Sequence, residues 1–109
     1  MTDYDAVVFV GGVGAQEYWA DSTAHAIAKA AVDSGKVLGA ICIAPVTLGN
    51  AGVLSGKRAT VWSSERERLE AGGAVYTGAD VEVDGRVVTA SGPGAAKEFG
   101  KRIATLLSE

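Results

Sequence analysis

Two short runs of the sequence consist almost entirely of apolar residues, and each ends at a turn-forming stretch. The first, "VVFV" at 7–10, is followed by two glycines, and the second, "KVLGAI" at 36–41, leads directly into Cys42. An apolar run that does not alternate with polar residues is typical of a strand buried on both faces, the usual state of a strand in a parallel sheet. The pattern therefore predicts an α/β fold with a mostly parallel sheet.

Helices are predicted between and after these strands. Apolar residues recur at helical spacing from about Thr23 to Gly35 and again from near Pro93 to the end of the chain. A shorter helix is predicted over 45–51, with Pro45 in its first turn, where proline is favoured. Strands that alternate with helices predict a sheet covered by helices on its faces.

The middle of the sequence predicts a third strand, a further helix and a hairpin. The strand is "RATVW" at 58–62, and the spacing of Ser64 and Glu67 fits a capping box for a helix that ends at 71. The segment "VEVDGRVVT" at 81–89 places a turn signal between two valine-rich runs. It predicts a hairpin with Asp84-Gly85 as its two-residue turn.

Composition and charge exclude several classes of protein. The chain has 109 residues, of which 48% are hydrophobic and 21% charged, and this suits one globular domain. Its net charge of −3, with acidic and basic residues interspersed, argues against nucleic acid as a partner. No apolar run approaches the roughly 20 residues of a membrane span. The start resembles no secretory signal, and one cysteine cannot form an internal disulfide, so a cytoplasmic location is expected.

Two interpretations of Cys42 follow from its position between a buried strand and a predicted helix. Cysteine often serves as a small buried hydrophobe, and that interpretation requires no other feature of the sequence. The alternative is a nucleophile elbow, in which a strand, a sharp turn and a helix present a nucleophile at the end of the sheet. A helix N-terminus stabilises a thiolate, and its free N–H groups can bind an oxyanion. Position alone leaves both interpretations open.

Three separated motifs carry a resemblance to a known family. Ala40, Ile41, Cys42 and Pro45 match an elbow of the form A-I-C-x-x-P, "YDAVVFVGG" matches the preceding strand and Gly-Gly turn, and "ASGPGAAKEFGKRIATLL" at 90–107 matches a closing helix. In this order they resemble the ThiJ/PfpI family, which includes intracellular peptidase-like proteins, glyoxalases and protein deglycases. The resemblance implies a flavodoxin-like three-layer sandwich related to class I glutamine amidotransferases.

The same resemblance implies a site. Cys42 would be the nucleophile, and the backbone N–H groups of Gly12 and Ile43 would form the oxyanion hole. Three further residues would line the site, namely Gly11, Pro45 and Trp62. No metal and no organic cofactor are implied.

The sequence departs from the family in two respects. Many members carry a histidine directly after the cysteine or after the next strand, and here Ile43 and Trp62 occupy those places. The only histidine, His25, lies on the first predicted helix, where a solvated role is expected. The family's opening strand-helix-strand section, which supplies a glutamate beside the cysteine, is also without a counterpart. Residues 1–109 are therefore expected to form a single, truncated ThiJ/PfpI-type domain.

The expected function is that of a cysteine-dependent hydrolase or lyase acting on a small carbonyl compound or a peptide. The alternative is a redox-sensing or chaperone-like, non-catalytic oligomeric module, because a reactive cysteine without a base suits oxidation. A third possibility is an incomplete product without a stable fold. The open edge of the strand at 7–10 would pair with a second copy, giving a homo-oligomer, or with a complementing N-terminal segment.

Overall fold

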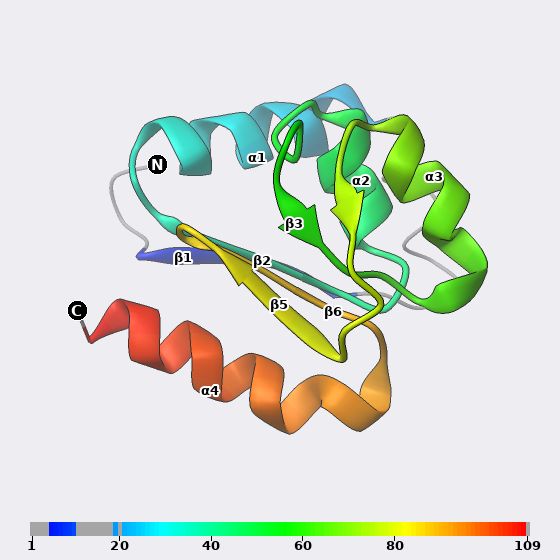
Figure 1. The fold of residues 1–109 in the computed structure, drawn as a ribbon. Helices are drawn as coiled ribbons and strands as arrows, with labels where there is room; N and C mark the ends of the chain where they lie inside the picture. The colour runs from blue at the N-terminus through cyan, green and yellow to red at the C-terminus, as the bar shows by residue number, and fades with distance from the viewer. Residues whose placement is uncertain (1–4, 11–18, 20, 109) are drawn as a thin grey trace.

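The sheet lies in the middle of three layers (Figure 1). The structure is a computed structural model and describes residues 5–10, 19 and 21–108. The sheet has the strand order β1-β2-β6-β5, in which β1, β2 and β6 run parallel and β5 antiparallel. Its strands are β1 (Ala6–Val10), β2 (Val37–Ile41), β5 (Val81–Asp84) and β6 (Val87–Ala90).

Helices cover both faces of this sheet (Figure 1). One face carries α1 (Ser22–Asp33), α2 (Pro45–Asn50) and α3 (Arg66–Ala71), with a small parallel sheet of β3 (Arg58–Ala59) and β4 (Val75–Tyr76). The other face carries α4 (Ala96–Leu107). Short 3₁₀ turns, Ser63–Glu65 and Pro93–Ala95, precede α3 and α4. The predicted flavodoxin-like α/β sandwich with a mostly parallel sheet is confirmed.

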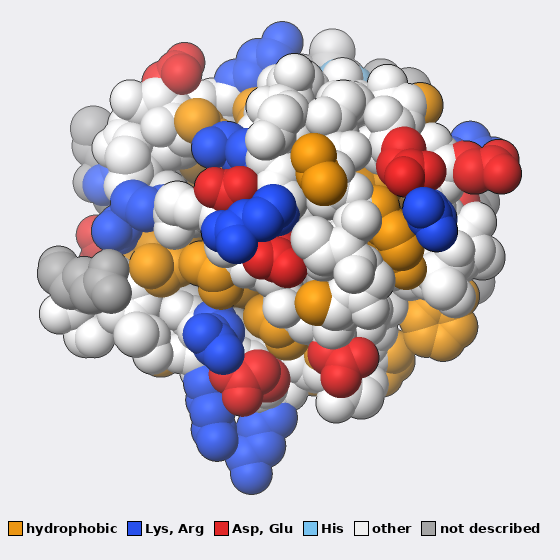
Figure 2. All heavy atoms as spheres, in the orientation of Figure 1, with side chains coloured by type: hydrophobic (Ala, Val, Ile, Leu, Met, Phe, Trp, Pro, Cys, Tyr) orange, Lys and Arg blue, Asp and Glu red, His pale blue; other side chains and the backbone are white. Residues whose placement is uncertain are grey.

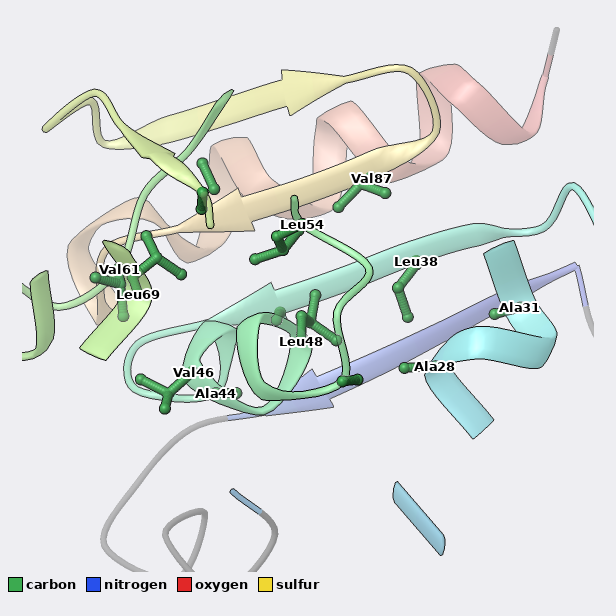
Figure 3. Close-up of a cluster of buried hydrophobic side chains, with 14 residues drawn as sticks. Ala28, Ala31, Leu38, Ala44, Val46, Leu48, Leu54, Val61, Leu69 and Val87 are labelled. Atoms are coloured by element: carbon green, nitrogen blue, oxygen red, sulfur yellow. The ribbon is translucent and has the colours of Figure 1, made fainter. Parts of the chain in front are cut away.

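Strand β2 joins the two hydrophobic clusters that make up the core. All five of its residues are buried. Leu38 belongs to the cluster under α1 and α2, where Figure 3 shows it near Leu48 of α2. Ile41 belongs to the cluster under α4. A strand buried on both faces must be apolar throughout, which explains why the run at 36–41 does not alternate.

The third predicted strand is shorter than expected. Only Arg58 and Ala59 form β3, although the prediction extended it to Trp62. Beyond Ala59 the backbone leaves the ladder, because the N–H of Thr60 donates to Oγ1 of Thr89 at 2.9 Å. The N–H of Trp62 donates to the carbonyl oxygen of Cys42 at 2.8 Å. This segment therefore connects the small sheet to the ends of the large one.

The hairpin forms as predicted, but its turn lies one residue later. Asp84 pairs with Val87, so Gly85 and Arg86 are the turn residues. Gly85 has a φ of +63°, which suits the first central position of a type II′ turn.

The predicted capping box is wrong. No side chain caps α3, which begins at Arg66. The Ser64 hydroxyl donates instead to the carboxylate of Glu65 at 2.9 Å, because a 3₁₀ turn occupies Ser63–Glu65.

Helices α2 and α3 approach each other through two glycines. A Cβ at Gly72 would lie 2.6 Å from the carbonyl carbon of Gly49 and 2.7 Å from its Cα. These are backbone atoms of α2, so a side chain at Gly72 could be accommodated only by moving that helix. The close approach fixes the position of α2, which begins three residues after Cys42.

Asp84 links the hairpin to β3. The backbone N–H of Arg58 donates to Oδ2 of Asp84 at 2.9 Å, and the Arg58 guanidinium lies 3.7 Å from the same oxygen. This backbone hydrogen bond lowers the pKa of the Asp84 carboxyl below its usual value, and the charges of Lys57 and Arg58 act in the same direction, while burial opposes them.

Among the described residues, no helix is both long enough and apolar enough to cross a bilayer. On the face shown in Figure 2, basic and acidic side chains are interspersed.

We predict that Gly72→Ala lowers the free energy of unfolding by about 1–3 kcal/mol, the usual cost of overpacking. Gly100→Ala is the matched control, since a Cβ there meets nothing within 4 Å. Gly100 lies within the exposed part of α4, so alanine should raise stability by up to about 1 kcal/mol. Urea denaturation measures both changes, and equal effects of the two substitutions would contradict the described contact.

We also predict that Asp84→Asn lowers stability at pH 7 by less than about 1 kcal/mol, because the carboxylate is partly solvated. A folded pKa below the unfolded value of about 3.9 gives a contribution that is present above that value. It is lost as pH falls through the folded pKa. The difference between wild type and variant should therefore shrink from about pH 4 downward. A difference independent of pH, measured by urea denaturation from pH 7 to 2.5, would contradict this role.

Candidate functional site

The backbone at Cys42 adopts a conformation that non-glycine residues rarely take. Its φ is +67°, and in the described part of the chain no other non-glycine residue has a positive φ. This left-handed conformation costs an L-residue roughly 1–2 kcal/mol. Cys42 directly follows β2 and precedes α2 by two residues, so the strained position is the turn between strand and helix.

Hydrogen bonds from two directions hold this conformation. The N–H of Cys42 donates to the carbonyl oxygen of Ala90, the last residue of β6, at 2.9 Å. The carbonyl oxygen of Cys42 accepts the N–H of Trp62 at 2.8 Å. Both peptide groups that flank the Cys42 Cα are therefore fixed by segments distant in sequence.

Cys42 is half-buried, as is Ile43 directly after it, while Ile41 and Ala44 on either side of this pair are buried. Ile41 before it is 7% exposed and Ala44 after it is 2% exposed, whereas Cys42 belongs to the intermediate class. Its side chain packs against the cluster under α4. Cys42 is thus neither sealed in the core nor freely solvated.

Ile43 and Pro45 shape the turn after the cysteine. No backbone carbonyl among the described residues accepts the N–H of Ile43, which leaves that donor available. The carbonyl oxygen of Ile43 accepts the N–H of Val46 at 3.3 Å and the indole N–H of Trp19 at 3.1 Å. Pro45 is the first residue of α2 and is buried. Because α2 has only six residues, its dipole contributes little at this turn.

Trp19 connects the elbow to the surrounding helices. Besides the indole bond to Ile43, its carbonyl oxygen accepts the side-chain N–H of Asn50 at 2.8 Å. Nε2 of His25 lies 2.7 Å from the same carbonyl oxygen and therefore carries a proton there. The guanidinium of Arg68 lies 4.8 Å from the Trp19 ring centroid, a cation–π distance. His25 is thus engaged with Trp19, as a structural residue.

Trp62 forms one wall of a cavity whose lining does not include Cys42, Ile43 or Pro45. Its backbone N–H donates to the carbonyl oxygen of Cys42, and the residue is 46% exposed. The cavity has a volume of about 380 Å³, and its lining includes the polar residues Ser63, Asp80 and Ser91. A Cβ at Gly92 would lie 2.8 Å from the Trp62 ring, so glycine leaves room for the indole.

Four of the six residues predicted for the site lie in the described part of the chain. Cys42, Ile43 and Pro45 form the turn, and Trp62 is bonded to it. Gly11 and Gly12 lie outside the described residues. Sequence reasoning missed the roles of Trp19 and of Ala90, because hydrogen bonds over such separations leave no local pattern.

Comparison with known proteins gives consistent matches. A family model described as "DJ-1/PfpI family" matches residues 1–106. An uncharacterized protein of Methanocaldococcus jannaschii is 42% identical, over 93% of this chain and 51% of that protein. A glutathione-independent glyoxalase of Caenorhabditis elegans is 31% identical, over 95% of this chain and 55% of that protein.

Solved structures give the same result. The crystal structure of a ThiJ/PfpI domain protein from Brachyspira murdochii superposes with a TM-score of 0.94 at 33% identity. The match covers 96% of this chain and 61% of that one. This chain therefore spans between about half and three fifths of the length of these proteins.

The left-handed backbone at Cys42 predicts an unusual order of stability for two variants. Cys42→Gly and Cys42→Ala both remove the sulfur, but only glycine adopts a positive φ without strain. We expect the glycine variant to be more stable than the alanine variant by about 1 kcal/mol. In a regular strand or helix, glycine is instead the less stable by roughly 0.5–1 kcal/mol. Thermal denaturation of both variants decides between these orders.

Proposed function

The chain belongs to the DJ-1/PfpI family, and from this membership we propose that it is a cysteine-dependent hydrolase or lyase acting on a carbonyl group. The proposed reaction is either peptide or amide cleavage, or glyoxalase or deglycase chemistry. The observation that carries the proposal is the φ of +67° at Cys42, directly after β2. A nucleophile on a strained turn between strand and helix is held where a substrate carbonyl can reach it.

In the proposed reaction the Cys42 thiolate attacks the carbonyl carbon. A carbon–sulfur bond forms, and the electron pair of the C=O bond moves to the oxygen. The N–H of Ile43 would donate to this oxyanion, as would that of Gly12 according to the family resemblance. The proposal is supported by the Ile43 N–H, which no described backbone carbonyl accepts. A fixed donor needs no reorganisation when charge develops, and this lowers the barrier.

The substrate is proposed to be a small carbonyl compound or a peptide, bound between Cys42 and Trp62. This is supported by Trp62, which is 46% exposed, lines a cavity of about 380 Å³ and donates its backbone N–H to the carbonyl oxygen of Cys42. Cys42 itself is not among the residues that line this cavity. Gly11 and Pro45 are proposed to line the same site. The thiol supplies the nucleophile, so the proposed reaction uses neither a metal nor an organic cofactor. A cytoplasmic location keeps that thiol reduced.

One observation favours a second candidate function. Nε2 of His25 is engaged with the carbonyl oxygen of Trp19, so the chain's only histidine does not serve as a base for Cys42. A half-exposed cysteine without an imidazole partner suits reversible oxidation to the sulfenic acid. The second candidate is therefore a redox-sensing, non-catalytic module.

Turnover of methylglyoxal tests the first candidate. We expect the wild-type chain to consume it and Cys42→Ala to reduce the rate by at least about 10³-fold, as loss of a nucleophile does. His25→Gln is the control, because glutamine can still donate to the Trp19 carbonyl. Its rate should stay within about threefold of wild type.

Two results would contradict the catalytic proposal. The first is turnover that persists in Cys42→Ala, since the reaction would then not need the thiol. The second is oxidation of Cys42 by peroxide, seen as added oxygen by mass spectrometry, together with no turnover of glyoxals or peptides. The second result would support the redox sensor.

A further inference from the structure

One peptide group of the elbow carries both a carbonyl that the fold holds and an N–H that the proposed reaction uses. The carbonyl oxygen of Cys42 and the N–H of Ile43 belong to the same peptide unit, and the peptide bonds of the described residues are trans. In a trans peptide the two groups lie in one plane and point in opposite directions. Rotation about the Cys42 Cα–C bond therefore moves them together, so a contact that fixes the carbonyl also fixes the direction of the N–H.

The backbone N–H of Trp62 is the contact that fixes this carbonyl. It donates to the carbonyl oxygen of Cys42 at 2.8 Å. The peptide units on either side are held by other groups, since the Cys42 N–H donates to Ala90 and the Ile43 carbonyl accepts the indole N–H of Trp19. A hydrogen bond accepted by a carbonyl also polarises its peptide unit, and this makes the N–H of that unit a stronger donor.

Two buried threonines hold the segment of Trp62 beside the elbow. The N–H of Thr60 donates to Oγ1 of Thr89 at 2.9 Å, and the hydroxyl of Thr60 donates to the carbonyl oxygen of Ala79 at 2.6 Å. Both threonines are almost completely buried. Thr89 directly precedes the residue of β6 that accepts the N–H of Cys42. The same end of β6 therefore anchors the cysteine and the segment that leads to Trp62.

Building on the proposed function, we propose that Trp62 is a positioning residue whose backbone N–H aims the Ile43 N–H at the oxyanion. Thr89 acts through it, because its hydroxyl holds the segment from Thr60 to Trp62 against the end of β6. The role belongs to the main chain at position 62. Every residue except proline supplies this N–H, so the role does not require the histidine that many family members carry at this place.

The kinetics of methylglyoxal turnover in two variants at position 62 test the proposal. Trp62→Pro removes the N–H, and the φ of Trp62, −50°, is within the range that proline adopts. Trp62→Ala is the reference, because it also lacks the indole but keeps the N–H. We expect kcat of the proline variant to be at least about tenfold below that of the alanine variant, part of the roughly 10²–10³-fold effect of an oxyanion donor. The two KM values should agree within about threefold, because only the transition state uses the N–H.

Alkylation of Cys42 by iodoacetamide separates positioning from a loss of structure. The thiolate displaces iodide from a saturated carbon, so a carbon–sulfur bond forms, a carbon–iodine bond breaks and no oxyanion develops. The alkylation rates of Trp62→Pro and Trp62→Ala should therefore agree within about threefold. An alkylation rate that falls as far as kcat does would show that proline disrupts the elbow itself, and it would overturn the proposal.

Variants of Thr89 test the same role without proline, and they decide the matter if Trp62→Pro does not fold. Thr89→Val keeps the branched shape but removes the acceptor of the Thr60 N–H, whereas Thr89→Ser keeps the oxygen. We expect kcat to be at least about fivefold lower in the valine variant than in the serine variant. Thr47→Val is the matched control, because Thr47 is equally buried and its hydroxyl has no hydrogen-bond partner among the described residues. It should leave kcat within about twofold of the wild-type value.

The wild-type chain distinguishes a failure of the proposed function from a failure of the positioning role. If the wild type turns over neither glyoxals nor peptides, both are overturned, because no oxyanion then forms. If the wild type is active and Trp62→Pro matches Trp62→Ala in kcat, only the positioning role of Trp62 is overturned. Equal kcat values of Thr89→Val and Thr89→Ser would overturn the part assigned to Thr89.

Discussion

The left-handed backbone of Cys42 is the constraint on which the candidate site depends. A residue with a side chain adopts this conformation only when its surroundings fix it more strongly than the strain opposes it. Here β6 fixes one side of Cys42 through the carbonyl of Ala90, and the segment after β3 fixes the other side through the N–H of Trp62. The order of the sheet, with β6 beside β2, is therefore what allows the cysteine to turn out of the strand.

Small residues bring the remaining parts close enough to support this turn. Gly39 on β2 leaves room for the Phe99 ring and for the Cδ1 methyl group of Ile103, because a Cβ at position 39 would lie 3.0 Å from each of them. Gly72 does the same at the end of α3, where a Cβ would lie 2.6 Å from the carbonyl carbon of Gly49 in α2. The geometry of the elbow follows from the whole fold, because the six-residue helix α2 could not hold it alone.

Much of this architecture could be predicted from the sequence, since local patterns encode it. Continuous apolar runs gave β1 and β2, and the spacing of apolar residues gave α1 and α4. The turn of the hairpin was predicted one residue too early in the chain, because the sequence does not show that Asp84 pairs with Val87. The third strand was predicted too long, because nothing local indicates that Thr60 bonds to the side chain of Thr89.

Part of the site could also be predicted, because local sequence patterns encode it. The position of Cys42 between a strand and a helix, with the family resemblance, identified the turn and its neighbours Ile43 and Pro45. The φ of Cys42 has no signature in a single sequence, since the residue type argues against it. The indole bond from Trp19 to Ile43 spans 24 positions, and only the assembled fold brings the two together.

Whether the native fold presents the Cys42 thiol to solvent can be measured directly from the rate at which iodoacetamide alkylates it at low urea concentrations. A thiol reached in the folded state reacts at a rate that hardly changes until the unfolding transition begins. A thiol reached only through global unfolding reacts at a rate that rises exponentially with urea, with the slope of the unfolding equilibrium. We expect the flat dependence, and the exponential dependence would contradict a thiol presented by the native fold.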